Sequence, residues 1–211
     1  MENKINNNNH PYVDLDLPSK TLWATCNVGA SKPSDAGFYF QWGDTNGYSA
    51  TQVGKDKQFT WNDYKWYLSG NYATDEIPLK FKKYTTEGAT LELEDDAAHA
   101  NMGGDWHMPT PAQISELINT ANTTSTWTTQ DGVNGRLFTS KNDSSKSIFF
   151  PAAGYAWDGS VHYSRRNDYV WSSMLSKSGV NYGQDLYFLS YYVSLDYYYR
   201  YFGFSVRGVR G

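Results

Sequence analysis

The chain has 211 residues, a formal net charge of −4 and an aromatic content of 17%. This length suits one large domain or two small ones, and so many tyrosines and tryptophans argue against a disordered chain. The acidic balance argues against a nucleic-acid partner, which usually meets a basic face, and no apolar run is long enough to insert into a membrane.

The chain begins with a polar, asparagine-rich segment. We predict a disordered arm over residues 1–11, followed by a single domain over residues 12–211. The arm lacks the apolar core of a signal peptide, so we expect either assembly inside a cell or an export signal that has been removed. The single cysteine, Cys26, excludes an internal disulfide and a multi-cysteine metal cluster.

Two strands are predicted near the N-terminus. One covers residues 22–28, where the buried face is formed by Leu22, Ala24, Cys26 and Val28. Cys26 is then a small core residue rather than a reactive thiol. Residues 38–42 alternate in the same way and predict the second strand. Residues 44–88 are polar and irregular, with scattered aromatics, which predicts a long insertion with little regular structure.

Two helices are predicted between residues 93 and 121. The first begins at the acidic residues 94–96 and ends at Gly103, with Leu93, Ala97 and Ala100 on its apolar face. The second begins at Thr110 with a proline at its first position and a glutamine closing a capping box. Its apolar stripe is formed by Ile114, Leu117, Ile118 and Ala121. We expect Trp106, in the connector, and Trp171 to be buried.

The titratable residues form no catalytic constellation. The carboxylates at the start of the first helix suit its dipole, and adjacent helix residues do not face each other. His107 has no serine or cysteine nucleophile placed beside it by the sequence, and His99 fits a packed or solvated position. Four arginines have a charge that suits an acidic ligand, but solvated surface positions or structural ion pairs are the stronger interpretation for them: Arg165, Arg166, Arg207 and Arg210.

The second half of the chain is predicted to be β-structure. The sequence pattern predicts a hairpin over residues 136–150, a strand over residues 169–173 and a loop over residues 174–185. The alternation over residues 204–209 predicts a half-buried final strand. Together with the two helices, these elements predict an α+β fold.

The segment from Leu186 to Phe204 is dominated by aromatics, which occupy ten of its nineteen positions. Because side chains alternate across a strand, its runs of tyrosine cannot all point inward. Any single tyrosine could belong to the core. For the cluster as a whole a binding surface is the stronger interpretation, because tyrosine offers a large, stiff contact area at low entropic cost.

Five segments carry a family resemblance, and in chain order they read YVDLDLPSKTLWATCNVGA, EDDAAHANMGGDWHMPTPAQISEL, FFPAAGY, YVWSS and GFSVRGVR. They resemble gut-bacterial and phage proteins with the C-type lectin fold, near the formylglycine-generating-enzyme branch. That group includes the variable proteins of diversity-generating retroelements. The resemblance covers nearly the whole chain after Pro11. It implies two helices packed on short antiparallel sheets with a long irregular insertion.

In the diversified relatives, the variable positions precede a GFSVR-type ending and lie on the surface of the lectin fold. Mutation of adenines there converts asparagine codons to codons for residues such as tyrosine, serine and aspartate, and residues 189–202 resemble one such outcome. The expected ligand-binding residues are Asn181, Tyr182, Leu189, Tyr191, Tyr192, Leu195, Asp196, Tyr197, Tyr198, Tyr199, Tyr201 and Phe202. We expect their tyrosines from position 191 onward to be mostly accessible and to form one contiguous patch.

The resemblance also limits the chemistry. Formylglycine-generating enzymes need paired cysteines for copper-dependent oxidation, and this chain has one. Calcium-dependent lectins use a Trp-Asn-Asp strand, which residues 61–63 match only in letters, because they lie upstream of both predicted helices. We therefore expect no metal and no cofactor.

The leading hypothesis is a non-enzymatic binding protein, such as a phage tail adhesin or a bacterial surface-display protein. Its ligand would be a protein or glycan on a cell surface, and its location the virion or the bacterial surface. The alternatives are an enzyme that acts on polysaccharide and a structural module of a larger assembly. The sequence defines neither the ligand nor the oligomeric state.

Overall fold

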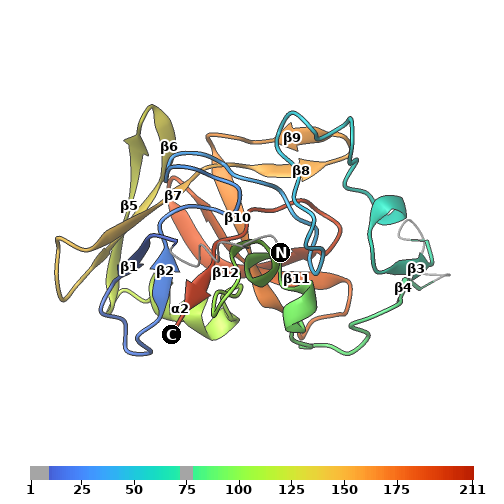
Figure 1. Cartoon of the computed structure of the whole chain (residues 1–211), viewed down its shortest axis with the longest axis horizontal. Helices are drawn as coiled ribbons and strands as arrows, with labels where there is room; N and C mark the ends of the chain where they lie inside the picture. Colours follow the sequence, from blue (N-terminus) through green and yellow to red (C-terminus); the bar gives the residue numbers. More distant parts are fainter. Residues whose placement is uncertain (1–9, 72–77) are drawn as a thin grey trace, which may run out of the picture.

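The computed structural model describes residues 10–71 and 78–211, and their strands pair antiparallel in five small sheets. With two short α-helices, the architecture is α+β, as predicted (Figure 1). Of the predicted N-terminal arm, residues 1–9 lie outside the described part. His10 and Pro11 are described, and the Thr25 backbone N–H donates to the Pro11 carbonyl oxygen.

One sheet joins the two ends of the described chain. It has the order β1 (Tyr12–Asp14), β2 (Leu22–Ala24) and β13 (Val209–Arg210). In its register Trp23 lies opposite both Val13 and Val209. Figure 1 shows the C-terminus beside β2. The first and last strands are thus both held by β2, which lies between them.

The predicted hairpin over residues 136–150 is confirmed. It is formed by β6 (Val133–Ser140) and β7 (Ser147–Pro151), and β5 (Thr123–Gln130) adds a third strand on the far side of β6. The buried rings of Phe138 and Phe150 meet edge to face in this sheet.

The sheet that positions the candidate site has the order β10 (Asn167–Leu175), β11 (Tyr182–Leu189) and β12 (Tyr192–Tyr199). The predicted strand at residues 169–173 lies inside β10. The predicted loop over residues 174–185 is too long, because β11 begins at Tyr182. A separate hairpin, β8 (Tyr155–Trp157) and β9 (Ser160–His162), lies near this sheet, and a single bridge joins Gly154 to β10.

The helices are shorter than predicted. Before α1 (Ala97–Met102), residues 93–95 form a separate 3-10 turn, so Leu93 is 59% exposed rather than on an apolar helix face. Asp96 caps α1 by accepting the His99 backbone N–H. The predicted capping box of α2 (Pro111–Ile118) is present, and Ala121 lies beyond the end of this helix. Trp106 and Trp171 are buried, as predicted.

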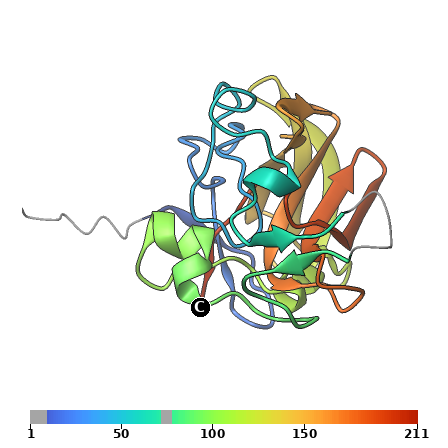
Figure 2. The ribbon, with the colours of Figure 1, turned by 90° about the vertical axis from the view of Figure 1, so that its right-hand side faces the viewer.

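The described part of the insertion is largely irregular, as predicted, and buried aromatics fix it to the core. It contains a 3-10 turn at Trp61–Asp63 and the short strands β3 (Tyr67–Ser69) and β4 (Lys80–Phe81). Figure 2 shows this unit in front of the β10–β11–β12 sheet. Trp61 and Phe81 both belong to the largest core cluster.

Three strand predictions fail wholly or in part, and residues 39–42 and 204–209 are enclosed in the interior instead of lying along its boundary. Residues 22–28 form a strand only to Ala24, Trp23 is wholly buried, and Cys26 is partly exposed. Residues 38–42 form isolated bridges and not a continuous strand. Residues 204–209 are buried on both sides, and Arg207, expected at the surface or in an ion pair, is wholly enclosed.

Candidate ligand-binding face

The β10–β11–β12 sheet has two different faces. On one face, Leu186 and Val170 pack with Ile114 and Leu117 of α2 in a buried cluster. The opposite face carries tyrosines and two aspartates, because side chains alternate along each strand. Between β10 and β11, the pairs on this face are Asn167–Leu189, Tyr169–Tyr187 and Trp171–Asp185. Between β11 and β12, they are Leu189–Tyr192, Tyr187–Ser194, Asp185–Asp196 and Gly183–Tyr198.

The rings on this side form a continuous band. Tyr187 stacks on Tyr169 with ring centroids 4.7 Å apart, and its ring lies 6.2 Å from that of Tyr192. Tyr169 in turn contacts Tyr198 at 5.7 Å and Tyr155 of β8 at 5.3 Å. We use the name aromatic face for the sheet residues Tyr169, Tyr187, Tyr192 and Tyr198 together with Tyr155, Trp157 and Tyr163 from the β8–β9 region.

The β8–β9 region extends the band to two exposed rings. Tyr155 contacts Tyr163 at 5.9 Å, and Trp157 stacks on Phe202 at 5.8 Å. Tyr163, Tyr192 and Trp157 are 55%, 49% and 39% exposed, whereas the rings between them are half-buried or buried. Exposed rings fixed by stacked neighbours suit a binding surface, because little side-chain entropy is lost on contact.

The phenols of Tyr155, Tyr169 and Tyr198 are protonated hydrogen-bond donors at neutral pH, because the pKa of each is raised. Burial raises the pKa of Tyr155 to about 12. Burial also raises the pKa of Tyr169 and Tyr198, and the nearby Asp185 carboxyl raises both further. The face can therefore offer hydroxyl groups and apolar ring surface at the same time.

Asp185 lies beneath these rings and has no partner. It is fully buried, and neither carboxyl oxygen has a hydrogen-bond donor in the described structure. Burial raises the pKa of Asp185 well above its usual value, and the charges of Asp196 and Asp168 raise it further. A buried carboxyl without partners destabilises the folded state once it is ionised.

We expect Asp185→Asn to stabilise the protein at pH 8 by about 1–3 kcal/mol and to change little at pH 4. The folded-state pKa of Asp185 is raised, so its contribution to stability is fully present below the unfolded pKa and is lost as the pH rises toward the folded pKa. Asparagine keeps the shape and cannot ionise. Urea unfolding at both pH values measures this effect, and an unchanged difference between pH 4 and pH 8 would contradict it.

The predicted ligand-binding residues do not form one patch. Tyr192 and Tyr198 lie on the aromatic face, with Leu189 and Asp196 beside them, and Tyr191, at the β11–β12 turn, is 86% exposed. The predicted residues on the other side of the sheet are Tyr182, Leu195, Tyr197 and Tyr199. Asn181 is half-buried, and its carbonyl oxygen accepts the Arg200 backbone N–H.

The expectation that Tyr201 is accessible is wrong, and Phe202, which was also expected to bind the ligand, is buried too. They are 8% and 5% exposed, because the chain turns inward after β12. The turn is fixed by the buried Arg200, whose Nε donates to the Tyr64 hydroxyl at 2.6 Å. Its guanidinium also donates to the carbonyl oxygens of Lys83, Tyr84 and Val180. Tyr201 then packs on Trp61 with centroids 4.5 Å apart.

Most of the aromatic face was not among the predicted site residues. Tyr169 lies in a predicted strand, and Tyr155 appears only at the end of the FFPAAGY segment, with no predicted role. Alternation in the two strands does relate Tyr187 to Tyr169. The adjacent residues Leu186 and Val170 are apolar and pair on the buried face, which places the two tyrosines together on the opposite face. No sequence pattern relates Trp157 to β12, because the contact passes through Phe202.

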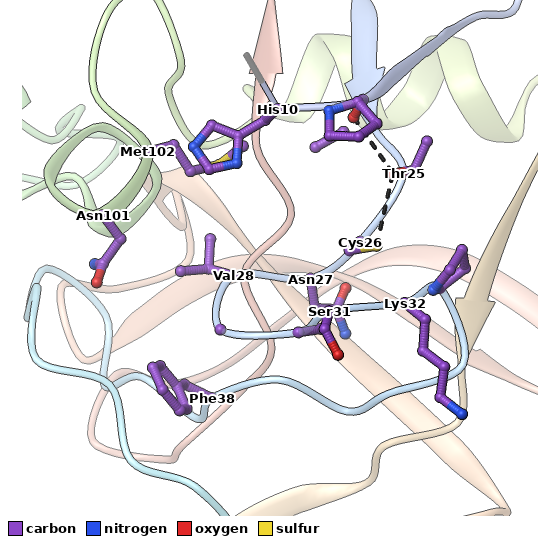
Figure 3. A pocket seen from close by; sticks show the side chains of 15 residues that line it. His10, Thr25, Cys26, Asn27, Val28, Ser31, Lys32, Phe38, Asn101 and Met102 are labelled. Carbon is purple, nitrogen blue, oxygen red and sulfur yellow. Dashed lines mark hydrogen bonds between the residues drawn. The ribbon is translucent and has the colours of Figure 1, made fainter. Parts of the chain in front are cut away.

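A separate pocket of about 430 Å³ surrounds Cys26 near the N-terminal end of the described chain (Figure 3). His10, Asn101 and Met102 also line it. The Thr25 hydroxyl is 3.6 Å from Cys26 Sγ, and the His10 ring meets Trp106 edge to face. This partly exposed position corrects the expectation of a buried cysteine, because the strand that would have turned Cys26 inward ends at Ala24.

One described group of carboxylates has the spacing of a metal site, and a lysine already occupies its centre. Glu92, Glu94 and Asp95 bring their oxygens within 4.8 Å of one another. Lys83 Nζ donates to all three carboxylates at 2.6, 3.0 and 2.6 Å. These contacts, led by Asp95, raise the pKa of Lys83, so the group carries its own cation.

The Trp-Asn-Asp segment is also engaged within the chain. The Asp63 carboxylate accepts backbone N–H groups from Gln58, Phe59 and Thr60 at 2.8, 2.9 and 2.8 Å. It therefore fixes a loop instead of presenting oxygens to a calcium ion.

We expect neither EDTA nor millimolar calcium to shift the thermal melt, because the acidic group and Asp63 are both satisfied internally. A differential scanning measurement with each additive tests this. A melting temperature that falls in EDTA and recovers with calcium would contradict it.

No protein-family model, curated protein or solved structure matches the chain. In the part of the chain that the structure describes, no helix has the length and apolar character needed to cross a membrane.

Proposed function

We propose that this chain is a non-enzymatic binding protein with a C-type lectin fold, and that the aromatic face selects a protein or glycan on a cell surface. The observation that carries the proposal is the band of stacked rings from Tyr192 to Trp157 with exposed rings at its ends. Tyrosine and tryptophan dominate the contacts that contribute most to binding free energy.

The fold assignment is supported by the arrangement of the elements. Two helices pack on small antiparallel sheets, an irregular insertion lies at one end, and the first and last strands both pair with β2. These features agree with what the sequence resemblance implies.

The proposed class, a variable protein of a diversity-generating retroelement, is supported by a contrast between two adjacent segments. Residues 203–208, which include the GFSVR ending, are buried and hold the fold together. The preceding residues, 189–199, lie in a turn and a strand whose side chains are exposed or half-buried, where we expect substitutions to be tolerated. A fixed framework beside a changeable surface suits diversification. The protein would then be displayed on a virion or a bacterial surface.

A polysaccharide-acting enzyme is the second candidate, because Asp185 and Asp196 face each other and a raised pKa suits a general acid. A general acid must reach the bond that it cleaves. Both Asp185 oxygens are covered, so the geometry favours binding over catalysis.

The direct test is to measure binding of the fluorescently labelled chain to a panel of intact gut-bacterial cells by flow cytometry. Saturable binding to a subset of strains, lost after protease or glycosidase treatment of those cells, would support the proposal and identify the ligand class. Binding to every strain alike, or to none, would contradict it.

The genome gives an independent test of the proposed class. A neighbouring reverse transcriptase gene and a template repeat that differs from the codons of residues 169–210 only at adenines would support it. A locus without either element would contradict the diversification proposal, while the binding proposal would still stand on the cell experiment.

A further inference from the structure

Two carboxylates lie opposite each other on the aromatic face without a cation. Asp185 pairs in register with Asp196, which is exposed. In the described part of the chain, neither carboxylate forms an ion pair. Directly opposed like charges destabilise a strand pair, and a buried carboxyl without partners is rare in folded proteins. Within the described chain, no cation offsets the repulsion between the two carboxylates, and no hydrogen bond stabilises the Asp185 carboxyl.

A second side chain on this face, Ser194, lacks a hydrogen-bond partner among the described residues, as Asp185 does. Ser194 lies on the same side of β12 as Asp196, two residues before it, and opposite Tyr187. Its hydroxyl is buried and has no hydrogen-bond partner. The face thus combines the exposed Asp196 carboxylate, whose Oδ1 accepts only the Tyr197 backbone N–H at 2.8 Å in the described chain, with an unpartnered hydroxyl and a covered carboxyl, within one short stretch of two strands.

The surrounding rings add to the negative character of this place. Tyr187, Tyr192 and Tyr198 lie on the same side of the sheet, and the face of an aromatic ring carries negative charge density. Cations bind over such faces, and more strongly where carboxylates are near.

We propose that this part of the aromatic face is a subsite for an organic cation, an ammonium or guanidinium group. The group is held by Asp196 and Ser194, with the three rings beside it and Asp185 beneath. The inference rests on the proposed function, because it names the chemical class that the same face selects.

The geometry suits an organic cation better than a metal ion. Calcium takes six to eight oxygen ligands, and magnesium an octahedral set. At this place only Asp196 presents carboxylate oxygens to solvent, because those of Asp185 are covered. An alkylammonium or guanidinium needs fewer oxygen contacts and gains from the rings.

Occupation of the subsite is coupled to a proton. Asp185 is surrounded by Asp168 and Tyr169 from β10, Tyr187 from β11, and Asp196 and Tyr198 from β12. None of these groups is cationic, and burial favours the protonated form of Asp185. A cation bound at Asp196 favours the ionised form. Binding therefore releases a proton, and affinity rises with pH.

Isothermal titration of the full chain with two cationic probes and their neutral counterparts tests the subsite. Acetyl-Gly-Arg-Gly-amide represents a protein side chain, with acetyl-Gly-Gln-Gly-amide as its control. D-glucosamine represents an amine on a glycan, with N-acetylglucosamine as its control. Titrations in two buffers with different ionisation enthalpies count the protons released.

We expect at least one cationic probe to bind and its neutral counterpart to bind at least about threefold more weakly. Asp196→Asn should weaken the cation by a similar factor, and Asp105→Asn, a change at an exposed aspartate in the helix connector, should have no effect. Asp185→Asn should bind the cation with no proton release. Equal binding of charged and neutral probes, or unchanged affinity in Asp196→Asn, would overturn the proposal.

The inference and the proposed function can fail separately. If no cationic probe binds but the chain still binds cells through the aromatic face, the cation subsite is wrong and the binding function stands. If a cationic probe binds at Asp196 but no cell is bound, the subsite stands and the proposed function fails.

Discussion

Arg207→Met is expected to lower the free energy of unfolding by about 3–5 kcal/mol, since it removes a wholly buried guanidinium that joins distant segments. Arg207 Nε donates to Asn27 Oδ1 at 2.8 Å. Its Nη1 donates to the carbonyl oxygens of Ala24 and Thr25 at 3.0 and 2.8 Å. A further N–H donates to the carbonyl oxygen of Phe149 in β7 at 3.2 Å. The final segment is thereby fixed to β7 and to the chain that follows β2.

The size of this effect comes from the acceptors that are left behind. Methionine fills most of the space and relieves the cost of burying a charge, but it gives no donor to these oxygens. Burial lowers the pKa of Arg207 to about 10, so the guanidinium is still charged at neutral pH and its hydrogen bonds are charge-assisted. The guanidinium also lies 4.3 Å from the centre of the Phe150 ring.

Thermal melts of Arg207→Met and Arg166→Met provide the comparison. For a chain of this length the first should melt about 6–20 °C lower. Arg166 is exposed, so the same substitution there should shift the melt by only a degree or two. Equal shifts for the two variants would show that the Arg207 contacts do not stabilise the fold.

Local patterns predicted the elements whose signals are complete within a few residues. The capping box of α2 lies within four residues, from Thr110 to Gln113, and the β6–β7 hairpin has its turn between two alternating runs. Both were found because propensity, capping and pairing act there over short distances.

Predictions failed where burial depends on what the rest of the chain covers. Alternation marks a strand with one face in water, so it misassigned residues 204–209, which are enclosed on both sides. The inward turn at Arg200 depends on acceptors supplied from Tyr64, Tyr84 and Val180, which are far away in the sequence. The aromatic face combines β8 with the β10–β11–β12 sheet, and no local pattern contains that contact.

Replacing Tyr163 and Tyr192 together by serine is expected to abolish cell binding while leaving stability within about 1 kcal/mol. Both rings are about half exposed at the edges of the aromatic face, so little core packing is lost. Each exposed anchor of an interface can contribute on the order of 2 kcal/mol, so the pair would weaken binding by roughly a thousandfold.

The matched control is Tyr12→Ser with Tyr197→Ser. These tyrosines are each 46% exposed, but Tyr12 lies in β1, and Tyr197 lies on the side of β12 opposite to Tyr192. Both double variants remove the same chemistry and similar exposed area, so only position differs.

Loss of binding in the control alone would move the site to the other side of the sheet. Undiminished binding in both variants would mean that none of these four tyrosines anchors the ligand, and the binding-face proposal would fail. Unfolding of Tyr163→Ser with Tyr192→Ser would mean that these rings belong to the core, and the binding-face proposal would fail.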